Sequence, residues 1–159
     1  EESIKDVLNE GWHFNTEEHV RVTPDSNGYF VIPTTYLRYD VHEGSVNRQL
    51  DVVKRNGRLY DKVQHTDVFT EDLYLDVVYL YTFTDIPSVF QRYIIAKAST
   101  RGAAQLVANS ETFKLLQNQE ATTRAAVLEY ECNQGDASFM GWPHESSYRP
   151  YQPYKSLIR

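Results

Sequence analysis

In this chain of 159 residues, the spacing of apolar residues that begins near His19 changes near Thr84. Before this point apolar residues stand in short alternating runs such as Leu37, Tyr39 and Val41, and a period of two indicates half-buried strands. After it they recur every three or four residues, which is the period of an amphipathic helix. A strand-rich part followed by a helical part predicts an α+β fold.

The clearest local signal in the strand-rich part is the pair Asn56 and Gly57, which separates the runs 50–55 and 58–63. Both central residues of a type I′ turn need positive φ, which Asn and Gly adopt at low cost. We therefore predict a β-hairpin at this point. The run 73–83 is apolar or aromatic on both alternating faces, and this pattern predicts a strand that is covered on both sides.

The first long helix is expected to begin with Asp85 as its N-cap and Pro87 in its first turn. Gly102 interrupts the helix at a cost of about 1 kcal/mol relative to alanine, either as a local bend or to admit a close neighbour. Asn109 and Ser110 are expected to close this helix and cap the next one. The apolar face comprises Ile86, Val89, Phe90, Tyr93 and Ile94, continued by Ala104, Val107 and Ala108.

The second long helix, over residues 111–133, carries two lines of apolar side chains. A helix in a monomer needs one such line, so the other either meets another subunit or packs inside the same fold. Gly135 is expected to end this helix. The first line is Ala121, Ala125, Leu128 and Cys132, and the second is Leu116, Val127 and Tyr130.

A short helix is also expected at the start of the chain. Residues 2–10 place Ile4, Val7 and Leu8 at helical spacing, and Gly11 ends the segment as a C-terminal cap would. Because the sequence begins without methionine, we expect a processed or truncated product and interpret this segment as the end of a longer helix.

The last 24 residues, 136–159, show no period but contain many apolar and aromatic side chains. The segment is too apolar for a solvated linker, and we interpret it as an arm that reaches across a neighbouring protein, up to roughly 80 Å when extended. Tyrosine is frequent in this chain, with 12 residues, and it is favoured at protein interfaces. The tyrosines inside strands have the alternative role of covering a sheet.

Charge and composition exclude several classes of protein. The net charge of −6 argues against a protein that grips nucleic acid, because neutralising phosphates requires a surplus of Lys and Arg. The sequence contains no long apolar run and no charged-then-apolar leader, so neither a membrane span nor a signal peptide is expected. The single cysteine, Cys132, excludes an intramolecular disulfide.

No pattern of catalytic, cofactor-binding or metal-binding residues is present in the sequence. The chain lacks a glycine-rich phosphate loop, and its histidines have no paired ligand spacing; they are His13, His19, His42, His65 and His144. Paired carboxylates could serve a glycosidase, but we interpret them as solvated surface charge, since the sequence indicates no cleft around them. These pairs are Glu17 with Glu18, Glu71 with Asp72, and Glu129 with Glu131.

Three segments together resemble the tail tubular protein A family of short-tailed bacteriophages. Residues 11–18 read Gly-Trp-His-Phe-Asn-Thr-Glu-Glu, as at the helix-to-sheet crossing of the family. Residues 85–99 are similar to the family's Pro-x-x-Phe-x-x-Tyr/Trp-Ile-x-x-Lys-Ala-Ser helix start, and residues 120–131 to its second long helix. The resemblance covers nearly the whole chain, although the C-terminal arm matches only loosely and the family begins with a further helical stretch.

The resemblance implies a structural virion protein of the tail, assembled in the host cytoplasm, with neither enzymatic activity nor a cofactor. Twelve copies would form a ring-shaped adaptor beneath the portal protein. The ring would continue the DNA channel towards the tail nozzle protein and help to seat the tail fibre protein, while genomic DNA passes without sequence-specific binding. The alternative is a cell-wall glycan hydrolase or a carbohydrate-binding tail component.

We therefore predict an α+β subunit whose terminal helices form a helical layer, with an antiparallel β-sheet inserted between them and an extended C-terminal arm. The expected parts are residues 1–18, the crossing; 19–84, the sheet; 85–135, two helices; and 136–159, the arm. Lys97 is either a snorkelling or salt-bridged lysine or half of an intersubunit ion pair. The predicted interface residues are Arg55, Arg58, Lys97, Tyr130, Trp142, Tyr148, Tyr151, Tyr154 and Leu157.

Overall fold

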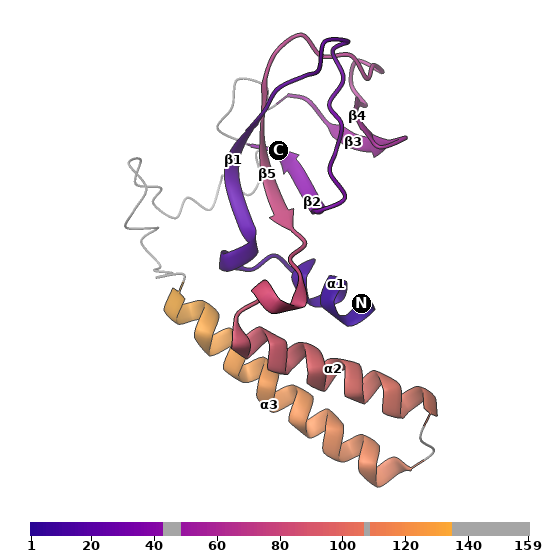
Figure 1. The fold of residues 1–159 in the computed structure, drawn as a ribbon, viewed down its shortest axis with the longest axis vertical. Helices are drawn as coiled ribbons and strands as arrows, with labels where there is room; N and C mark the ends of the chain where they lie inside the picture. Colours follow the sequence, from indigo (N-terminus) through magenta and orange to yellow (C-terminus); the bar gives the residue numbers. More distant parts are fainter. Residues whose placement is uncertain (43–48, 107–108, 135–159) are drawn as a thin grey trace. The chain divides into compact units, whose positions relative to one another are not determined.

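The computed structural model describes residues 1–42, 49–106 and 109–134. The chain divides into two compact units, Glu1–Pro87 and Ser88–Arg159 (Figure 1). The first unit contains two small antiparallel sheets and a short helix, and the second contains two long helices. The predicted α+β fold is confirmed.

The larger sheet has three strands in the order β1-β5-β2, with both pairs antiparallel. These strands are β1 (Thr16–Val22), β2 (Tyr36–Val41) and β5 (Leu73–Tyr79). The central position of β5 agrees with its predicted cover on both sides, because Leu75 and Val77 are buried on one face and Val78 on the other. The strand ends at Tyr79, earlier than predicted, and the 3₁₀ helix η2 (Phe83–Asp85) follows.

The predicted hairpin is confirmed: β3 (Val52–Arg55) pairs with β4 (Arg58–Asp61), and Asn56 and Gly57 have φ angles of 51° and 78°. The expectation of a single sheet is wrong, because this hairpin forms a separate two-stranded sheet. After β4 the chain turns back on itself, and the Asp61 N–H donates to the Thr66 carbonyl at 2.8 Å. This turn leads the chain away from the hairpin, and β4 does not pair with β5.

The run 29–32 is joined to the hairpin by an isolated bridge. Val31 pairs with Arg58, and the Leu59 N–H donates to the Phe30 carbonyl at 3.0 Å. These bonds attach the hairpin to the core of the first unit. That core comprises Phe30, Ile32, Val41, Val52, Leu59, Phe69, Leu73, Leu75 and Val77.

The chain starts with the helix α1 (Glu2–Leu8), and Gly11 follows with a φ of 79°. This agrees with the predicted short helix and its glycine stop. The next segment is the 3₁₀ helix η1 (His13–Asn15), which leads directly into β1.

The second unit consists of α2 (Ser88–Leu106) and α3 (Ser110–Gln134). The predicted N-cap at Asp85 is wrong: α2 begins after Pro87, and the Asp85 carboxylate accepts a bond from the Thr82 hydroxyl within the preceding turn. Asn109 caps α3 as predicted, since its side-chain oxygen accepts the N–H groups of Glu111 and Thr112 at 2.9 and 3.3 Å.

Gly102 lies in the uninterrupted helix α2. A Cβ atom added at this position would meet no atom within 4 Å, apart from its own chain neighbours and helix backbone. The expectation that this glycine admits a close neighbour is therefore wrong for the described part of the chain.

Candidate interaction surfaces

Asn15 holds together the crossing between α1 and the sheet. Its side chain is fully buried, and its amide nitrogen donates to the carbonyls of Leu8 and Tyr79 at 2.9 and 3.0 Å. Its amide oxygen accepts the Trp12 N–H at 2.8 Å, and the Trp12 indole donates to the Val7 carbonyl at 2.7 Å. One side chain therefore connects α1, η1 and β5, so the Gly-Trp-His-Phe-Asn segment acts as a structural joint.

Gly11 serves the same joint. Its φ of 79° is one that side chains rarely adopt, and an added Cβ would lie 2.8 Å from the Arg38 guanidinium. The guanidinium at the end of the Arg38 side chain could shift, so glycine is needed here for its backbone conformation.

The tip of the β3–β4 hairpin presents two arginines, and each lies over a tyrosine ring. The Arg55 guanidinium lies 3.9 Å from the Tyr60 ring centroid, and that of Arg58 lies 3.9 Å from the Tyr29 centroid. Both arginine side chains are exposed, and Arg58 is also 3.7 Å from the Asp67 carboxylate. Stacking on aromatic rings holds these long side chains in place at low entropy cost, so the tip is a fixed basic surface on an acidic protein.

Tyr93 is the centre of the α2–α3 packing. It is buried, and its hydroxyl accepts a bond from the Arg124 guanidinium at 2.7 Å. The Lys97 ammonium is 5.7 Å from the centroid of the same ring, and Phe90 meets the ring of Tyr130 edge to face at 5.9 Å. Two of the predicted interface residues, Lys97 and Tyr130, therefore take part in contacts inside this unit.

The two apolar lines of α3 differ in burial. Val127 is buried and Leu116 and Tyr130 are half-buried, so this line faces α2. All four residues of the other line are exposed, and Leu128 is 47 % exposed; they are Ala121, Ala125, Leu128 and Cys132. We call this line the α3 stripe.

The structure brings together two histidines that are scattered in the sequence. The rings of His19 and His42 stack with centroids 4.8 Å apart. One oxygen of Asp76 lies 2.7 Å from Nδ1 of His42 and accepts the His19 backbone N–H at 3.0 Å. His19 has a φ of 60° at the point where β1 shifts its register against β5. Sequence reasoning missed this contact because hydrophobic spacing does not reveal a bulge.

The described residues include no group of three or more His, Cys, Asp or Glu side chains placed to hold a metal ion. None of the helices in these parts of the chain combines the length and the apolar character needed to cross a lipid bilayer.

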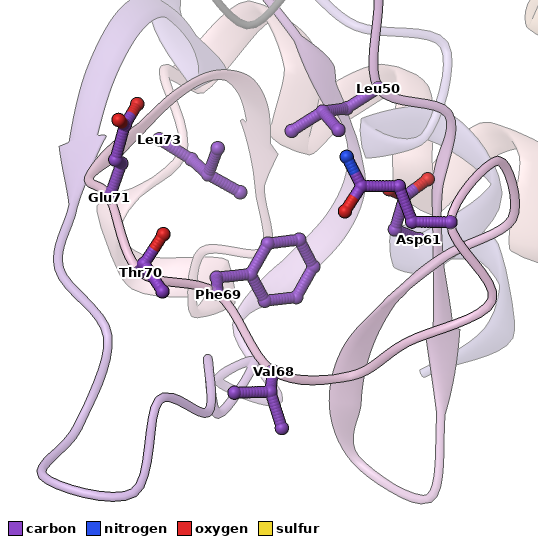
Figure 2. A pocket seen from close by; sticks show the side chains of 8 residues that line it. Leu50, Asp61, Val68, Phe69, Thr70, Glu71 and Leu73 are labelled. Carbon is purple, nitrogen blue, oxygen red and sulfur yellow. The ribbon is translucent and has the colours of Figure 1, made fainter.

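A cavity of about 270 Å³ lies beside the hairpin, lined by Leu50 and by residues of β4, β5 and the segment between them (Figure 2). Part of the lining is apolar, including Leu50, Phe69 and Leu73. The polar part includes Asp61, which is 1 % exposed, and the exposed Glu71. Sequence reasoning did not single out Asp61, because nothing in the pattern of β4 marks it as buried.

The carboxylate pair Glu71 and Asp72 is divided between two environments. The Asp72 carboxylate forms an ion pair with Arg21 at 2.6 Å, and this bond raises the pKa of the arginine above its usual value. Glu71 lines the cavity. The pair therefore does not act as a unit, whereas a glycosidase needs two carboxyl groups that face one cleft.

Five of the predicted interface residues lie outside the described residues. They are Trp142, Tyr148, Tyr151, Tyr154 and Leu157. The predicted C-terminal arm and Gly135 also lie there, as do Val107 and Ala108 of the predicted apolar face.

Comparison with known proteins supplies the family. No curated protein matches the chain. The family model described as "Tail tubular protein" matches residues 1–137, which include the Asn15 joint, both sheets and both long helices. Because this match covers most of the sequence, the chain belongs to the tail tubular protein family and is a structural component of a phage tail.

Proposed function

We propose that this chain is the A-type tail tubular protein of a short-tailed phage, a ring-shaped adaptor between the portal and the tail nozzle. About twelve copies, assembled in the host cytoplasm, would close the ring by repeated head-to-tail contacts. The family match supports a place in the tail. It gives no support to the alternative of a glycan hydrolase or a carbohydrate-binding component.

The observation that carries this proposal is the exposure of the α3 stripe. A helix that only packs against α2 needs a single apolar line, and the line containing Val127 supplies it. Leu128 is a large exposed side chain of this stripe, and the small residues Ala121 and Ala125 beside it allow a second helix to approach closely. We assign this surface to the contact between neighbouring subunits.

Other surfaces are assigned to other partners. The basic hairpin tip, with Arg55 and Arg58, is proposed to meet the nozzle or the fibre protein. The arm, residues 136–159, is proposed to make ring and portal contacts together with Lys97 and Tyr130. The parts 1–18, 19–84, 85–135 and 136–159 would then serve as joint, partner-facing sheet, ring-forming helices and arm.

Genomic DNA would pass through the ring without being held. The net charge of −6 supports this role, because an acidic conduit repels phosphates and does not trap them.

Native mass spectrometry tests the ring directly. The wild-type chain is expected to form a closed oligomer, and Leu128→Lys is expected to shift it to monomers, because a charge cannot be buried unpaired in an apolar contact. Ser99→Lys is the matched control: it places the same charge on an exposed position of α2. A wild-type chain that stays monomeric at every concentration, or a Leu128→Lys ring of unchanged mass, would contradict the assignment.

A further inference from the structure

Asp61, the last residue of β4, is buried with one carboxylate oxygen unsatisfied. Oδ1 accepts the Val63 backbone N–H at 2.8 Å. Oδ2 has no hydrogen-bond partner among the described residues, and the residue is only 1 % exposed. Removing a carboxylate oxygen from water without a partner is costly, so a donor or a cation from outside this chain would stabilise the arrangement.

The cavity beside Asp61 provides space for such a group. Its volume is about 270 Å³, and it has an acidic, polar part and an apolar part. The polar part is formed by Asp61, Gln64, Thr70 and Glu71. Figure 2 shows the labelled Phe69 ring between Leu50 and Thr70, with Asp61 on the Leu50 side. The lining contains two carboxylates and no basic residue, so the cavity favours a positively charged guest.

The number of available oxygens selects the kind of cation. Only one oxygen of Asp61 lacks a partner, whereas a guanidinium binds best to two parallel acceptors. A calcium ion takes six or more oxygen ligands, usually from several carboxylates. An ammonium group is a compact point charge that needs one strong acceptor and a few weaker ones, which Asp61, Gln64 and Thr70 offer.

The apolar part of the lining favours an ammonium group on a hydrocarbon stem. The methylene groups of lysine pack along apolar surface while the charged end reaches polar groups. Leu50 and Phe69 would contact such a stem, and Asp61 would receive its ammonium.

We propose that this cavity receives a lysine side chain from a partner protein, with the ammonium bound by Asp61 and assisted by Glu71. That the partner is a tail component rests on the proposed function, whereas the binding site itself does not. The site can therefore be tested on the isolated chain, where failure to form rings has no bearing on the result.

The test is an NMR titration of the ¹⁵N-labelled chain with Nα-acetyl-lysine methylamide. Saturable shifts are expected at the cavity residues, including Gln64 and Thr70. Asp61→Asn is expected to weaken binding about tenfold, the effect of losing one charge-assisted hydrogen bond. Glu18→Gln, which removes an exposed carboxylate from β1, is the control and should leave binding unchanged.

Two further ligands test whether binding needs the charge and whether it needs more of lysine than an amine on a hydrocarbon chain. The Nε-acetylated ligand, which keeps the stem but lacks the charge, is expected not to bind, and n-butylammonium is expected to bind more weakly than the lysine amide. Binding of the acetylated ligand as tightly as the charged one would overturn the proposal. Equal or tighter binding of n-butylammonium would assign the site to a free amine and overturn the lysine assignment.

The Asn variant keeps an oxygen that can accept the Val63 N–H, and its own spectrum shows whether it folds. If it does not fold, Glu71→Gln carries the test, because Glu71 is exposed and its loss should weaken binding about threefold. Absence of any saturable shift in the wild-type chain, or equal binding by the charge-removing variant, would contradict the site.

Discussion

The two units of the chain bury apolar surface to different extents. In the first, nine buried apolar residues form one continuous cluster that β5 crosses. In the second, α2 buries five residues, but α3 buries only Val127 along 25 residues, and Ile95, Leu106, Leu115 and Leu128 remain exposed. The first unit therefore carries its own core, whereas the second presents apolar surface that a single chain does not need for its own packing.

The contrast extends to the polar contacts. The first unit fixes its crossing through the buried Asn15, which makes three hydrogen bonds of 2.8 to 3.0 Å. The second unit is organised around Tyr93, whose hydroxyl accepts a bond from Arg124 and whose ring lies beside the Lys97 ammonium.

Truncation of a core residue should show the contrast most strongly. Leu75→Ala in the centre of β5, where the side chain is fully buried, is expected to lower the free energy of unfolding by about 3 kcal/mol through the cavity it leaves. Leu128→Ala on the exposed stripe should change it by less than about 0.5 kcal/mol. Denaturant unfolding of the monomeric protein checks both values, and equal losses would erase the distinction between the units.

Loss of the crossing joint should have the next largest effect. Asn15→Ala removes all three bonds, which join Trp12, Leu8 and Tyr79 through one buried side chain, so a loss of about 2 to 3 kcal/mol is expected. Asn27→Ala, at an exposed position of the same unit, is the control for amide removal. Indistinguishable midpoints for the two variants in thermal unfolding would refute the structural role of the joint.

One substitution, glycine to alanine, should act in opposite directions in the two units. At Gly57, where φ is 78°, alanine is expected to destabilise by about 1 kcal/mol because side chains disfavour this conformation. At Gly102 in α2 it should stabilise by up to about 1 kcal/mol, since the added Cβ meets no atom. Calorimetry of both variants is the measurement, and shifts of the same sign would contradict the assigned backbone conformations.

The smallest expected effect is on the folding stability of the first unit at alkaline pH. Burial raises the pKa of Tyr79 well above its usual value of 10, with a further contribution from its hydrogen bond with Tyr36. The folded form therefore holds this proton more tightly than the unfolded form. Its contribution to stability is complete below pH 10 and is lost as the pH rises through the raised pKa. Absorbance at 295 nm should show one fewer late-ionising tyrosine in Tyr79→Phe; an unchanged titration would contradict this.

Local chemistry predicted much of the fold. The Asn-Gly turn, the cap at Asn109 and the central strand each depend on short-range rules, and the structure confirms them. The division into two sheets did not follow from the sequence, because it depends on the return of the chain after Asp61 and not on any periodicity. The α2 start was misplaced because Asp85 is engaged by Thr82 within the preceding turn.

The candidate surfaces were predicted less completely. The α3 stripe was visible as a second apolar line, but spacing alone does not tell which line faces α2. The stacked His19 and His42 and the buried Asp61 come from a bulge and from a tight turn. Both features depend on tertiary contacts that hydrophobic patterning does not encode.

The central claim is that the α3 stripe faces another subunit, and Cys132 allows a direct test. It is the single cysteine of the sequence and is exposed on the stripe, so a photoreactive crosslinker can be attached there alone. On irradiation we expect covalent dimers whose crosslinked peptides join the stripe to a second copy. A Cys132→Ser, Glu18→Cys chain labelled on β1 should give few such dimers. Monomers alone from the Cys132 label, or equal dimer yields from both positions, would contradict the account.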